Sequence, residues 1–249
     1  MLFSTRTATI LIAIALIGWG VIHFLVGDFI AGRAPSWPEN IPGKLIWAYL
    51  SGVVLIVSAL VLIIPNSKTR VIVTCLGIVI LAWAGGRNLW IVLSNLDYGG
   101  VLTMFGKSIT IGSGLLLLSL DKKKSIFRFA CVCIGIFFII GGVQHFIFID
   151  FVKTLVPRWI PGDAFWSYVA GVGLAAAGIA LITGIQRNLA ALVSSWMVLI
   201  WFLILHIPRG FTADSQPAAI NEWIAIFEAL FVSAILAVIY WREKLEKLS

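Results

Sequence analysis

A few ionisable residues interrupt the apolar stretches in the second half of this chain. Glu228 stands six residues after Glu222 inside one such stretch, while His145 and His206 lie near the ends of two others. A charge in hydrocarbon costs about 2.5 to 3.5 kcal/mol on insertion scales, so an ionisable residue within a membrane span is a candidate for a site. Carboxylate and imidazole groups can both transfer protons. We therefore predict Glu228, His145 and His206 as catalytic residues of one polar pocket.

Arg209 and Glu222 are candidates for binding a substrate in the same pocket. Arg209 follows His206 by three residues, a spacing that places both side chains on one face of a helix. We expect Arg209 to hold the Glu228 carboxylate ionised, or else a histidine to exchange a proton with it. Three aromatic residues are also candidates for substrate binding: Trp159, Trp166 and Tyr168. The two tryptophans, held by the rigid turns at Pro157 and Pro161, could cap the pocket.

A structural role would also account for these residues. The polar side chains could satisfy one another and tie several helices together, with Arg209 extending its guanidinium to the membrane interface and His145 bonding a backbone carbonyl. The aromatic side chains could form the belt that tryptophan and tyrosine build at membrane surfaces. A path for ions is a third interpretation, and the sequence alone leaves all three open.

The composition indicates an integral membrane protein. Hydrophobic residues make up 61% of the 249 positions, charged residues 12%, and the mean hydropathy is +1.06. Apolar runs long enough to cross a hydrocarbon core of roughly 30 Å occur at 8–29, 45–64, 70–93, 101–120, 126–149, 164–184, 188–206 and 221–241. None alternates with a period of two residues, so the prediction is an all-α polytopic membrane protein with eight transmembrane helices.

The chain repeats part of its own sequence. The segment Gly20–Phe24 reads Gly-Val-Ile-His-Phe and reappears as Gly-Val-Gln-His-Phe at Gly142–Phe146. Each copy ends an apolar run and precedes a loop with proline and tryptophan, which in the first half is Pro35–Trp37. A Trp-x-Tyr-x-x-Gly pattern then begins at Trp47 and again at Trp166. This spacing predicts two copies of one unit of roughly 120 residues.

The predicted units are residues 1–123 and 124–249, each with four helices. An even number of spans per unit inserts both copies in the same direction, so we expect the two repeats to be parallel. The first copy keeps His23 but has no acidic residue matching Glu222, and it has a glycine near the position of Glu228. If there is one pocket, we expect the second unit to hold it and the first to close or scaffold it.

The distribution of charge predicts how the chain lies in the membrane. The formal net charge is +7, and much of it comes from the loops of one side, for example the run Asp121–Lys124 followed by Arg128. By the positive-inside rule, we expect both termini in the cytoplasm and the pocket on the outer side of a bacterial inner (cell) membrane. The expected partner of the basic residues is the lipid bilayer, and a nucleic acid is not an expected partner.

Several segments of the second half combine histidine, tryptophan, proline, arginine and glutamate in a recognisable order: His145–Phe146, Pro157–Gly162, Trp166–Gly171, Leu205–Arg209 and Asn221–Glu228. With these motifs the chain resembles the DoxX-like integral membrane proteins, a family similar to the membrane subunit of thiosulfate:quinone oxidoreductase. The resemblance is fainter in the first half, and the doubled architecture departs from the single-unit pattern of the family. What it implies is a fold of four-helix units with a pocket on the outer side that binds a quinone or passes electrons to one.

Together these features favour a quinone-linked redox component. The sequence contains no motif for a flavin, a dinucleotide, an iron–sulfur cluster or a metal site, so electrons would come from a small substrate or from a redox partner protein. Haem held by His145 and His206 is a less favoured interpretation. The alternative to a redox role is a non-catalytic assembly or interaction subunit, or a small-solute transporter whose anionic cargo meets Arg209.

Overall fold

The computed structural model describes residues 4–30, 40–64, 70–95, 98–120 and 123–246, and these ranges contain helices but no strand. The predicted all-α fold is therefore confirmed for this part of the chain. Within it, eight helical spans are long and apolar enough to cross a membrane. The chain is thus a multi-pass membrane protein. Two features named above, the motif at 35–37 and the loop positions 121–122, lie outside the described residues.

The spans of the first half are α1 (Thr5–Val26), α2 (Lys44–Ile63), a third span in three pieces, and α5 (Gly100–Ser119). The three pieces are α3 (Arg70–Val79), the π-helical segment η1 (Ile80–Gly85) and α4 (Gly86–Asn95). The spans of the second half are α6 (Lys124–Ile147), α8 (Asp163–Thr183), a seventh span in three pieces, and α11 (Gln216–Glu246). The seventh span consists of α9 (Arg187–Trp201), the π-helical segment η3 (Phe202–His206) and α10 (Ile207–Thr212). A short helix α7 (Ile149–Val152) and a 3-10 turn η2 (Lys153–Leu155) connect α6 to α8.

Several helix boundaries differ from the predicted runs, including both ends of α11, and two of the differences have a local physical cause. The first run was predicted to reach residue 29, but α1 ends at Val26 because Gly27 has a left-handed backbone (φ 65°) and its N–H bonds the carbonyl of His23. The seventh span passes its predicted end at residue 206 and continues to Thr212. Pro208 has no N–H to donate and its ring opposes the carbonyl one turn earlier, which fits the wider turn of η3 just before it.

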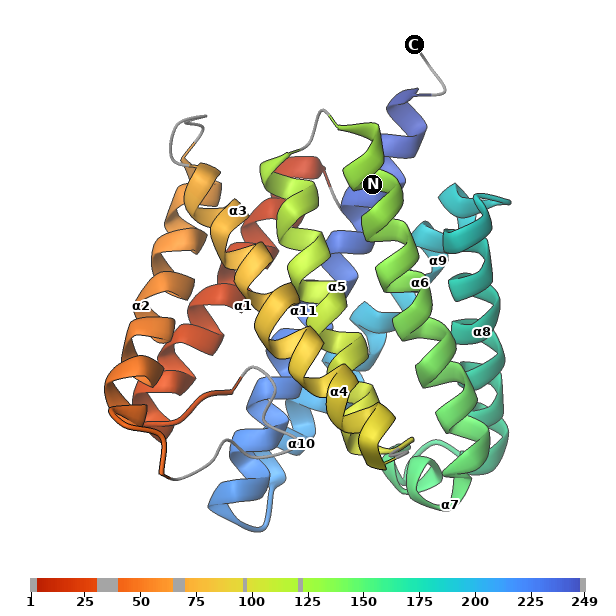
Figure 1. Cartoon of the computed structure of the whole chain (residues 1–249). Coiled ribbons are helices and arrows are strands. Elements are labelled where there is room, and N and C mark those ends of the chain that lie inside the picture. Colours follow the sequence, from red (N-terminus) through yellow and green to blue (C-terminus); the bar gives the residue numbers. More distant parts are fainter. Residues whose placement is uncertain (1–3, 31–39, 65–69, 96–97, 121–122, 247–249) are drawn as a thin grey trace.

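The two ends of the described chain lie on the same side of the bundle. α1 begins and α11 ends at the upper end in Figure 1, as an even number of spans requires. The short helices α7 and α10 lie at the opposite end, which we call the α7–α10 end.

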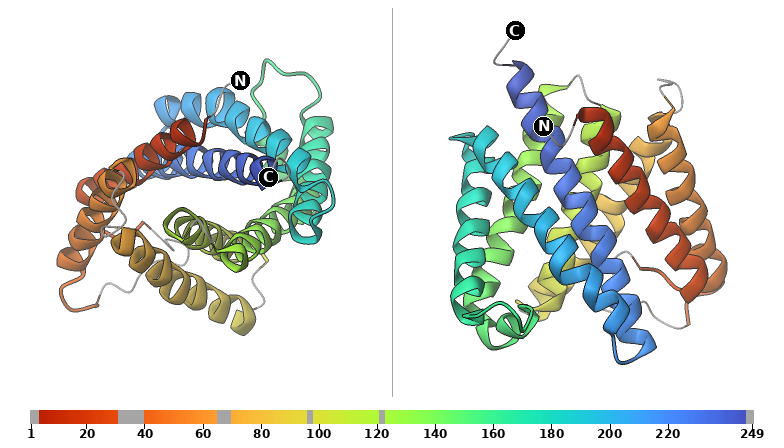
Figure 2. Two further views of the ribbon diagram at one scale, coloured as in Figure 1. Left: turned by 90° about the horizontal axis from the view of Figure 1, so that it is seen from above. Right: turned by 180° about the vertical axis from the view of Figure 1, so that it is seen from behind.

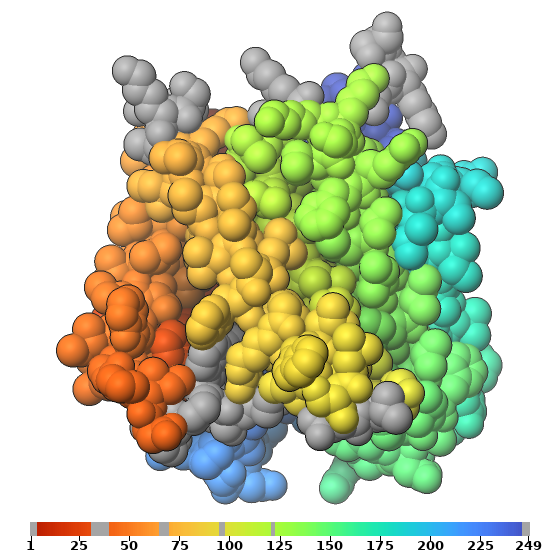
Figure 3. All heavy atoms as spheres, in the orientation of Figure 1, coloured from red at the N-terminus to blue at the C-terminus, as the bar shows by residue number. Residues whose placement is uncertain are grey.

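α11 and α5 form the interior of the bundle and are the two most buried spans. α11 packs against α1 and α9, while α5 packs against α3 and α6. Seen from above, α11 crosses the middle of the molecule (Figure 2). In the space-filling view of one side, α2, α3, α4 and α6 form the outer wall, and α11 is hidden behind them over most of its length (Figure 3).

Matching glycine contacts join the first two helices of each half. A Cβ on Gly20 would lie 2.9 Å from the carbonyl oxygen of Gly52, and a Cβ on Gly142 would lie 2.8 Å from that of Gly171. Only small residues let two helix backbones approach this closely. The aromatic contacts beside them also match, with ring centroids 5.4 Å apart in both pairs: Phe24–Tyr49 and Phe146–Tyr168. The same two contacts therefore recur between the first two spans of each half.

Candidate functional site

A cavity of about 630 Å³ lies between α5 of the first half and helices of the second half, toward the α7–α10 end. Its walls come mainly from α5, α6, the seventh span and α11. Most of the lining is apolar and much of that is aromatic: Phe137, Phe138, Phe148, Phe151 and Trp201. The polar side chains on its walls are few: Thr103, Lys107, Gln144, His145, His206, Arg209, Glu222 and Glu228. This combination of apolar walls and few polar groups is typical of a site for a small molecule.

The structure brings all five predicted ionisable residues of the second half to this cavity. On α11, residues 222, 225, 229 and 232 follow the spacing of one helix face, and Glu228 lies beside that stripe. Glu228 is six residues along α11 from Glu222, and so about 9 Å deeper into the bundle. His206 belongs to the π-helical segment η3, and Arg209 to α10 just beyond it. Such π-helical turns occur often at functional sites.

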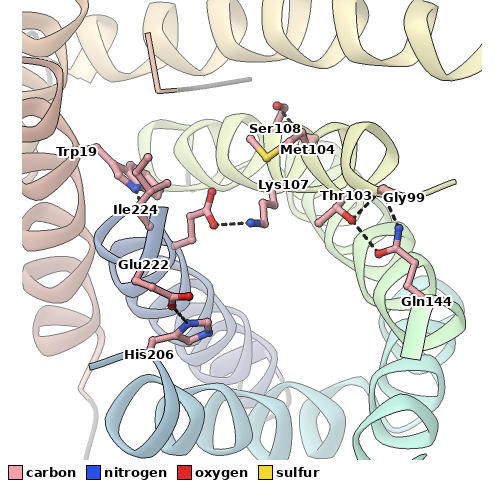
Figure 4. Close-up of polar contacts among 11 residues, drawn as sticks. Trp19, Gly99, Thr103, Met104, Lys107, Ser108, Gln144, His206, Glu222 and Ile224 are labelled. Atoms are coloured by element: carbon pink, nitrogen blue, oxygen red, sulfur yellow. Dashed lines mark hydrogen bonds and ion pairs between the residues drawn. The ribbon is translucent and has the colours of Figure 1, made fainter. Parts of the chain in front are cut away.

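Glu228 forms an ion pair with Lys107 of α5, a residue of the first half. Lys107 Nζ lies 2.5 Å from Oε2 of Glu228, and the two side chains are 25% and 11% exposed (Figure 4). This pairing corrects the expectation that Arg209 or a histidine is the partner of Glu228. The partner comes from the other half because α5 and α11 are neighbouring interior helices. Each charge would lose several kcal/mol of hydration if it were buried alone, so each needs the other.

Arg209 and His206 instead surround Glu222 nearer the α7–α10 end. Arg209 donates from Nε and Nη2 to Oε1 of Glu222, at 2.9 and 2.5 Å. His206 Nδ1 lies 3.7 Å from Oε2 of the same carboxylate (Figure 4). His206 and Arg209 lie on one side of their span, as expected, and both approach the carboxylate of Glu222. Both N–H groups of Arg209 donate to Oε1 of Glu222, so Oε2 of Glu222 is left on the side of His206.

His145 presents one occupied and one open ring nitrogen. Its Nδ1 lies 2.7 Å from the carbonyl oxygen of Gly141, one helical turn earlier. A carbonyl can only accept, so Nδ1 carries the proton and the neutral ring offers Nε2 as an acceptor. Nε2 has no hydrogen-bond partner among the described residues. The imidazole also stacks against Trp201, with ring centroids 6.3 Å apart, which fixes its plane in the cavity wall.

Gln144 of α6 holds the residues at the start of α5 by hydrogen bonds. Its amide nitrogen donates to the carbonyl oxygens of Tyr98 and Gly99, at 2.7 and 3.0 Å. Its amide oxygen accepts from Thr103 Oγ1 at 2.8 Å (Figure 4). Since Thr103 and Gly99 also line the cavity, Gln144 positions part of the wall that the first half contributes.

The segment α7–η2 borders the cavity with an apolar inner face and a charged outer one. Phe151 and Leu155 line the cavity. On the exposed side, Lys153 donates to Asp150 at 2.7 Å, and this hydrogen bond, together with the ammonium charge, lowers the pKa of the Asp150 carboxyl. The segment is therefore amphipathic, as expected for chain lying at a membrane surface.

The three aromatic residues predicted to bind substrate do not line the large cavity. Trp159 is 72% exposed, and Trp166 donates from its indole nitrogen to the carbonyl oxygen of Pro161 at 3.1 Å. Tyr168 packs on Phe146, with ring centroids 5.4 Å apart. Their outward positions near the α7–α10 end fit the alternative interpretation, an aromatic belt at the membrane surface.

Lys107, Thr103 and Gln144 are cavity residues that the sequence analysis did not identify. Lys107 could have been predicted from the sequence, because it is the one charged residue of the apolar run 101–120. An ionisable residue within a membrane span is a candidate site residue, and this criterion selected Glu228. Gln144 had a weaker one: it replaces the apolar Ile22 of the first copy within an otherwise repeated motif.

A second and much smaller cavity, of about 40 Å³, shares the Lys107–Glu228 pair with the large one. It is bordered on the first-half side by Trp19 and His23. His23 Nδ1 lies 2.8 Å from the carbonyl oxygen of Trp19, and the N–H of Ile30 donates to Nε2 at 3.4 Å. Both ring nitrogens of this buried histidine are therefore occupied by backbone groups.

The formal charges of the two ion pairs in the large cavity cancel. Lys107 and Arg209 each pair with a carboxylate, of Glu228 and Glu222 respectively. The described residues contain no group of three or more His, Cys, Asp or Glu that could hold a metal ion. The arrangement suits an uncharged molecule that has an apolar body and a small number of hydrogen-bonding atoms.

One family model matches the chain, described as a domain of unknown function (DUF8561), over residues 134–243. The matched segment contains His145, His206, Arg209, Glu222 and Glu228 but not Lys107. Searches of curated proteins and of solved structures found no match.

Proposed function

We propose that this membrane protein binds a quinone in the large cavity and acts as a quinone-linked redox component. The observation that carries the proposal is the cavity itself, about 630 Å³ in volume, with aromatic walls and polar groups from four helical spans. A quinone is uncharged, has a flat apolar ring and carries two oxygens, which matches a site whose two ion pairs are internally neutral. Its apolar body would pack against rings such as Phe138 and Trp201.

The polar groups of the cavity can serve the proton chemistry of such a ligand. Interconversion of a quinone and its quinol moves protons together with electrons. Lys107 uses one of its donors on Glu228 and has others for a ligand oxygen. His145 offers an acceptor at Nε2. A redox partner protein or a small substrate would supply or receive the electrons.

The proposal includes an orientation in the cell membrane. Basic residues gather at the end where the described chain begins and finishes: Arg6, Arg70, Lys124, Arg128, Arg187 and Arg242. The positive-inside rule puts this end in the cytoplasm and the α7–α10 end, with the cavity, outside. A reporter fused to the C-terminus that is active only in the cytoplasm tests this. Activity of a reporter that works only outside the cell would reverse the orientation.

Transport fits the cavity less well than binding. Beyond its inner end, toward the upper end of the bundle in Figure 1, the interior is filled by large apolar side chains, among them Leu115, Ile134 and Ile235, all fully buried. A solute crossing the protein would have to part this packed core. The cavity is therefore better suited to hold a ligand that enters and leaves at the same end.

Purification in mild detergent followed by mass spectrometry of the extracted small molecules tests the function. We expect a quinone at nearly one molecule per protein, and much less of it in Glu228→Gln. The matched control is Glu243→Gln, the same change on the same helix, because Glu243 pairs with Arg187 at 3.3 Å away from the cavity. Recovery of bulk lipid alone with the wild-type protein would contradict the proposal and favour an assembly or interaction subunit.

A further inference from the structure

We infer that the large cavity favours the reduced, hydroxyl-bearing form of its ligand, a quinol, and that His145 Nε2 accepts the hydrogen bond of its hydroxyl group. The inference rests on the proposed function and goes further by naming the redox form that the site recognises and the residue that recognises it.

The protonation of His145 follows from its backbone contact. Because Nδ1 lies 2.7 Å from the carbonyl oxygen of Gly141, the neutral ring must place its proton there. Nε2 then holds a lone pair. It can accept a hydrogen bond but cannot donate one.

The surroundings of His145 leave that acceptor for a ligand. The side chain lines the large cavity, and Nε2 has no partner among the described residues. Stacking against Trp201 restrains the ring, so the lone pair keeps its direction. Fixed hydrogen-bonding groups of this kind provide orientation and specificity in otherwise apolar sites.

His23, at the matching position of the first half, has backbone partners for both ring nitrogens. Its Nδ1 makes the equivalent contact, to the carbonyl oxygen of Trp19, but the N–H of Ile30 donates to its Nε2. The backbone supplies to His23 the donor that His145 lacks. A ligand hydroxyl would give His145 the same kind of partner.

The two redox forms of one ligand differ in what they can offer to this acceptor. A quinone presents carbonyl oxygens, which only accept, so its oxygen would face the lone pair of Nε2 without a proton between them. A quinol presents O–H groups, one of which can donate to Nε2, while the oxygens still accept from Lys107. A site built to hydrogen-bond a hydroxyl group disfavours a ligand without it, because the group on the protein is then left unpaired.

Titration calorimetry without oxygen, on the purified full-length protein with a short-chain benzoquinone and its quinol, tests the inference. We expect the quinol to bind about tenfold more tightly than the quinone, which corresponds to one hydrogen bond. His145→Phe should bring the ratio of the two Kd values close to one, whereas His145→Gln, whose carbonyl oxygen can accept, should keep part of the preference. His23→Phe is the matched control and should keep the full ratio.

The outcomes separate this inference from the function on which it rests. Equal binding of both forms to the wild-type protein, or tighter binding of the quinone, overturns the inference and leaves quinone binding standing. An unchanged preference in His145→Phe overturns the role of His145. If neither form binds, the proposed function and the inference both fail.

Discussion

The two histidines of the repeated motif occupy matching helical positions but border cavities of very different size. His23 and His145 both turn Nδ1 to the carbonyl of the residue four positions earlier. In the first half that residue is Trp19, whose buried indole occupies the space beside the histidine and donates to the carbonyl of Ile224 at 3.3 Å. In the second half it is Gly141, which has no side chain and lines the large cavity.

This comparison teaches that one helical framework can be closed or open depending on a few side chains. The histidine beside the small cavity of about 40 Å³ has both ring nitrogens bonded, whereas Nε2 of the histidine that lines the large cavity of about 630 Å³ has no partner among the described residues. The Lys107–Glu228 pair lines both and is the link between them. The first half thus forms part of the wall of the large cavity and contributes one charged residue, Lys107, to it.

Removing one member of the shared ion pair is expected to have the largest effect on stability. Lys107→Met leaves the Glu228 carboxylate without its partner and should destabilise the protein by about 3 kcal/mol. The double variant Lys107→Met/Glu228→Met should recover to within about 1 kcal/mol of the wild type, because no uncompensated charge remains. Equilibrium unfolding in detergent micelles measures both. Glu228→Met alone completes the cycle, and a double variant as unstable as the two single variants added together would show that Lys107 and Glu228 do not stabilise each other.

Making the second half resemble the first should close the large cavity. Gly141→Trp introduces the residue found at the matching position, Trp19, and should weaken quinol binding at least about a hundredfold, or roughly 2.7 kcal/mol. Gly141→Ala is the control, since its Cβ would make only an ordinary contact with Leu174 at 3.5 Å. Calorimetry of both variants provides the comparison. Undiminished binding to Gly141→Trp would place the ligand elsewhere.

The glycine contacts should be equally sensitive in the two halves. Gly20→Ala and Gly142→Ala would each push a Cβ to within 2.9 Å of a backbone atom of the facing helix, and each should cost about 2 kcal/mol. Gly86→Ala meets nothing within 4 Å and has ordinary helical angles, so it should be neutral or stabilise by up to about 1 kcal/mol. Thermal unfolding of the three variants is the measurement. A large cost in only one half would argue against equivalent packing.

The smallest effect on stability is expected from changing Gln144, which differs from its counterpart Ile22 in the repeated motif. Gln144→Ile restores the residue of the first copy and removes hydrogen bonds to Tyr98, Gly99 and Thr103. Loss of this anchor should cost about 1 kcal/mol and loosen the connection between α4 and α5. Hydrogen exchange should accelerate at the amides of residues 98–103. Unchanged exchange there would mean that other contacts hold this connection.

Sequence reasoning predicted the helices because each span satisfies the same requirement of length and hydropathy. It also predicted that five ionisable residues of the second half line one pocket, because a charge within a membrane span is costly and therefore marks a candidate site. The same rule, applied to the first half, would have identified Lys107 as a further ionisable residue of the cavity. The pairing of Lys107 with Glu228 could not be predicted, because it depends on how α5 and α11 pack across the bundle. Nor does hydropathy report the π-helical turn before Pro208, which alters the hydrogen-bond pattern and not the polarity.

Labelling with a photoreactive quinone, followed by peptide mapping of the full-length protein in membranes, tests the central claim most directly. The account predicts labels on residues lining the large cavity, from α5, α6, the seventh span and α11, and competition for them by unlabelled quinol. Labels confined to lipid-facing residues, or placed on α1 and α2 beside His23, would contradict it.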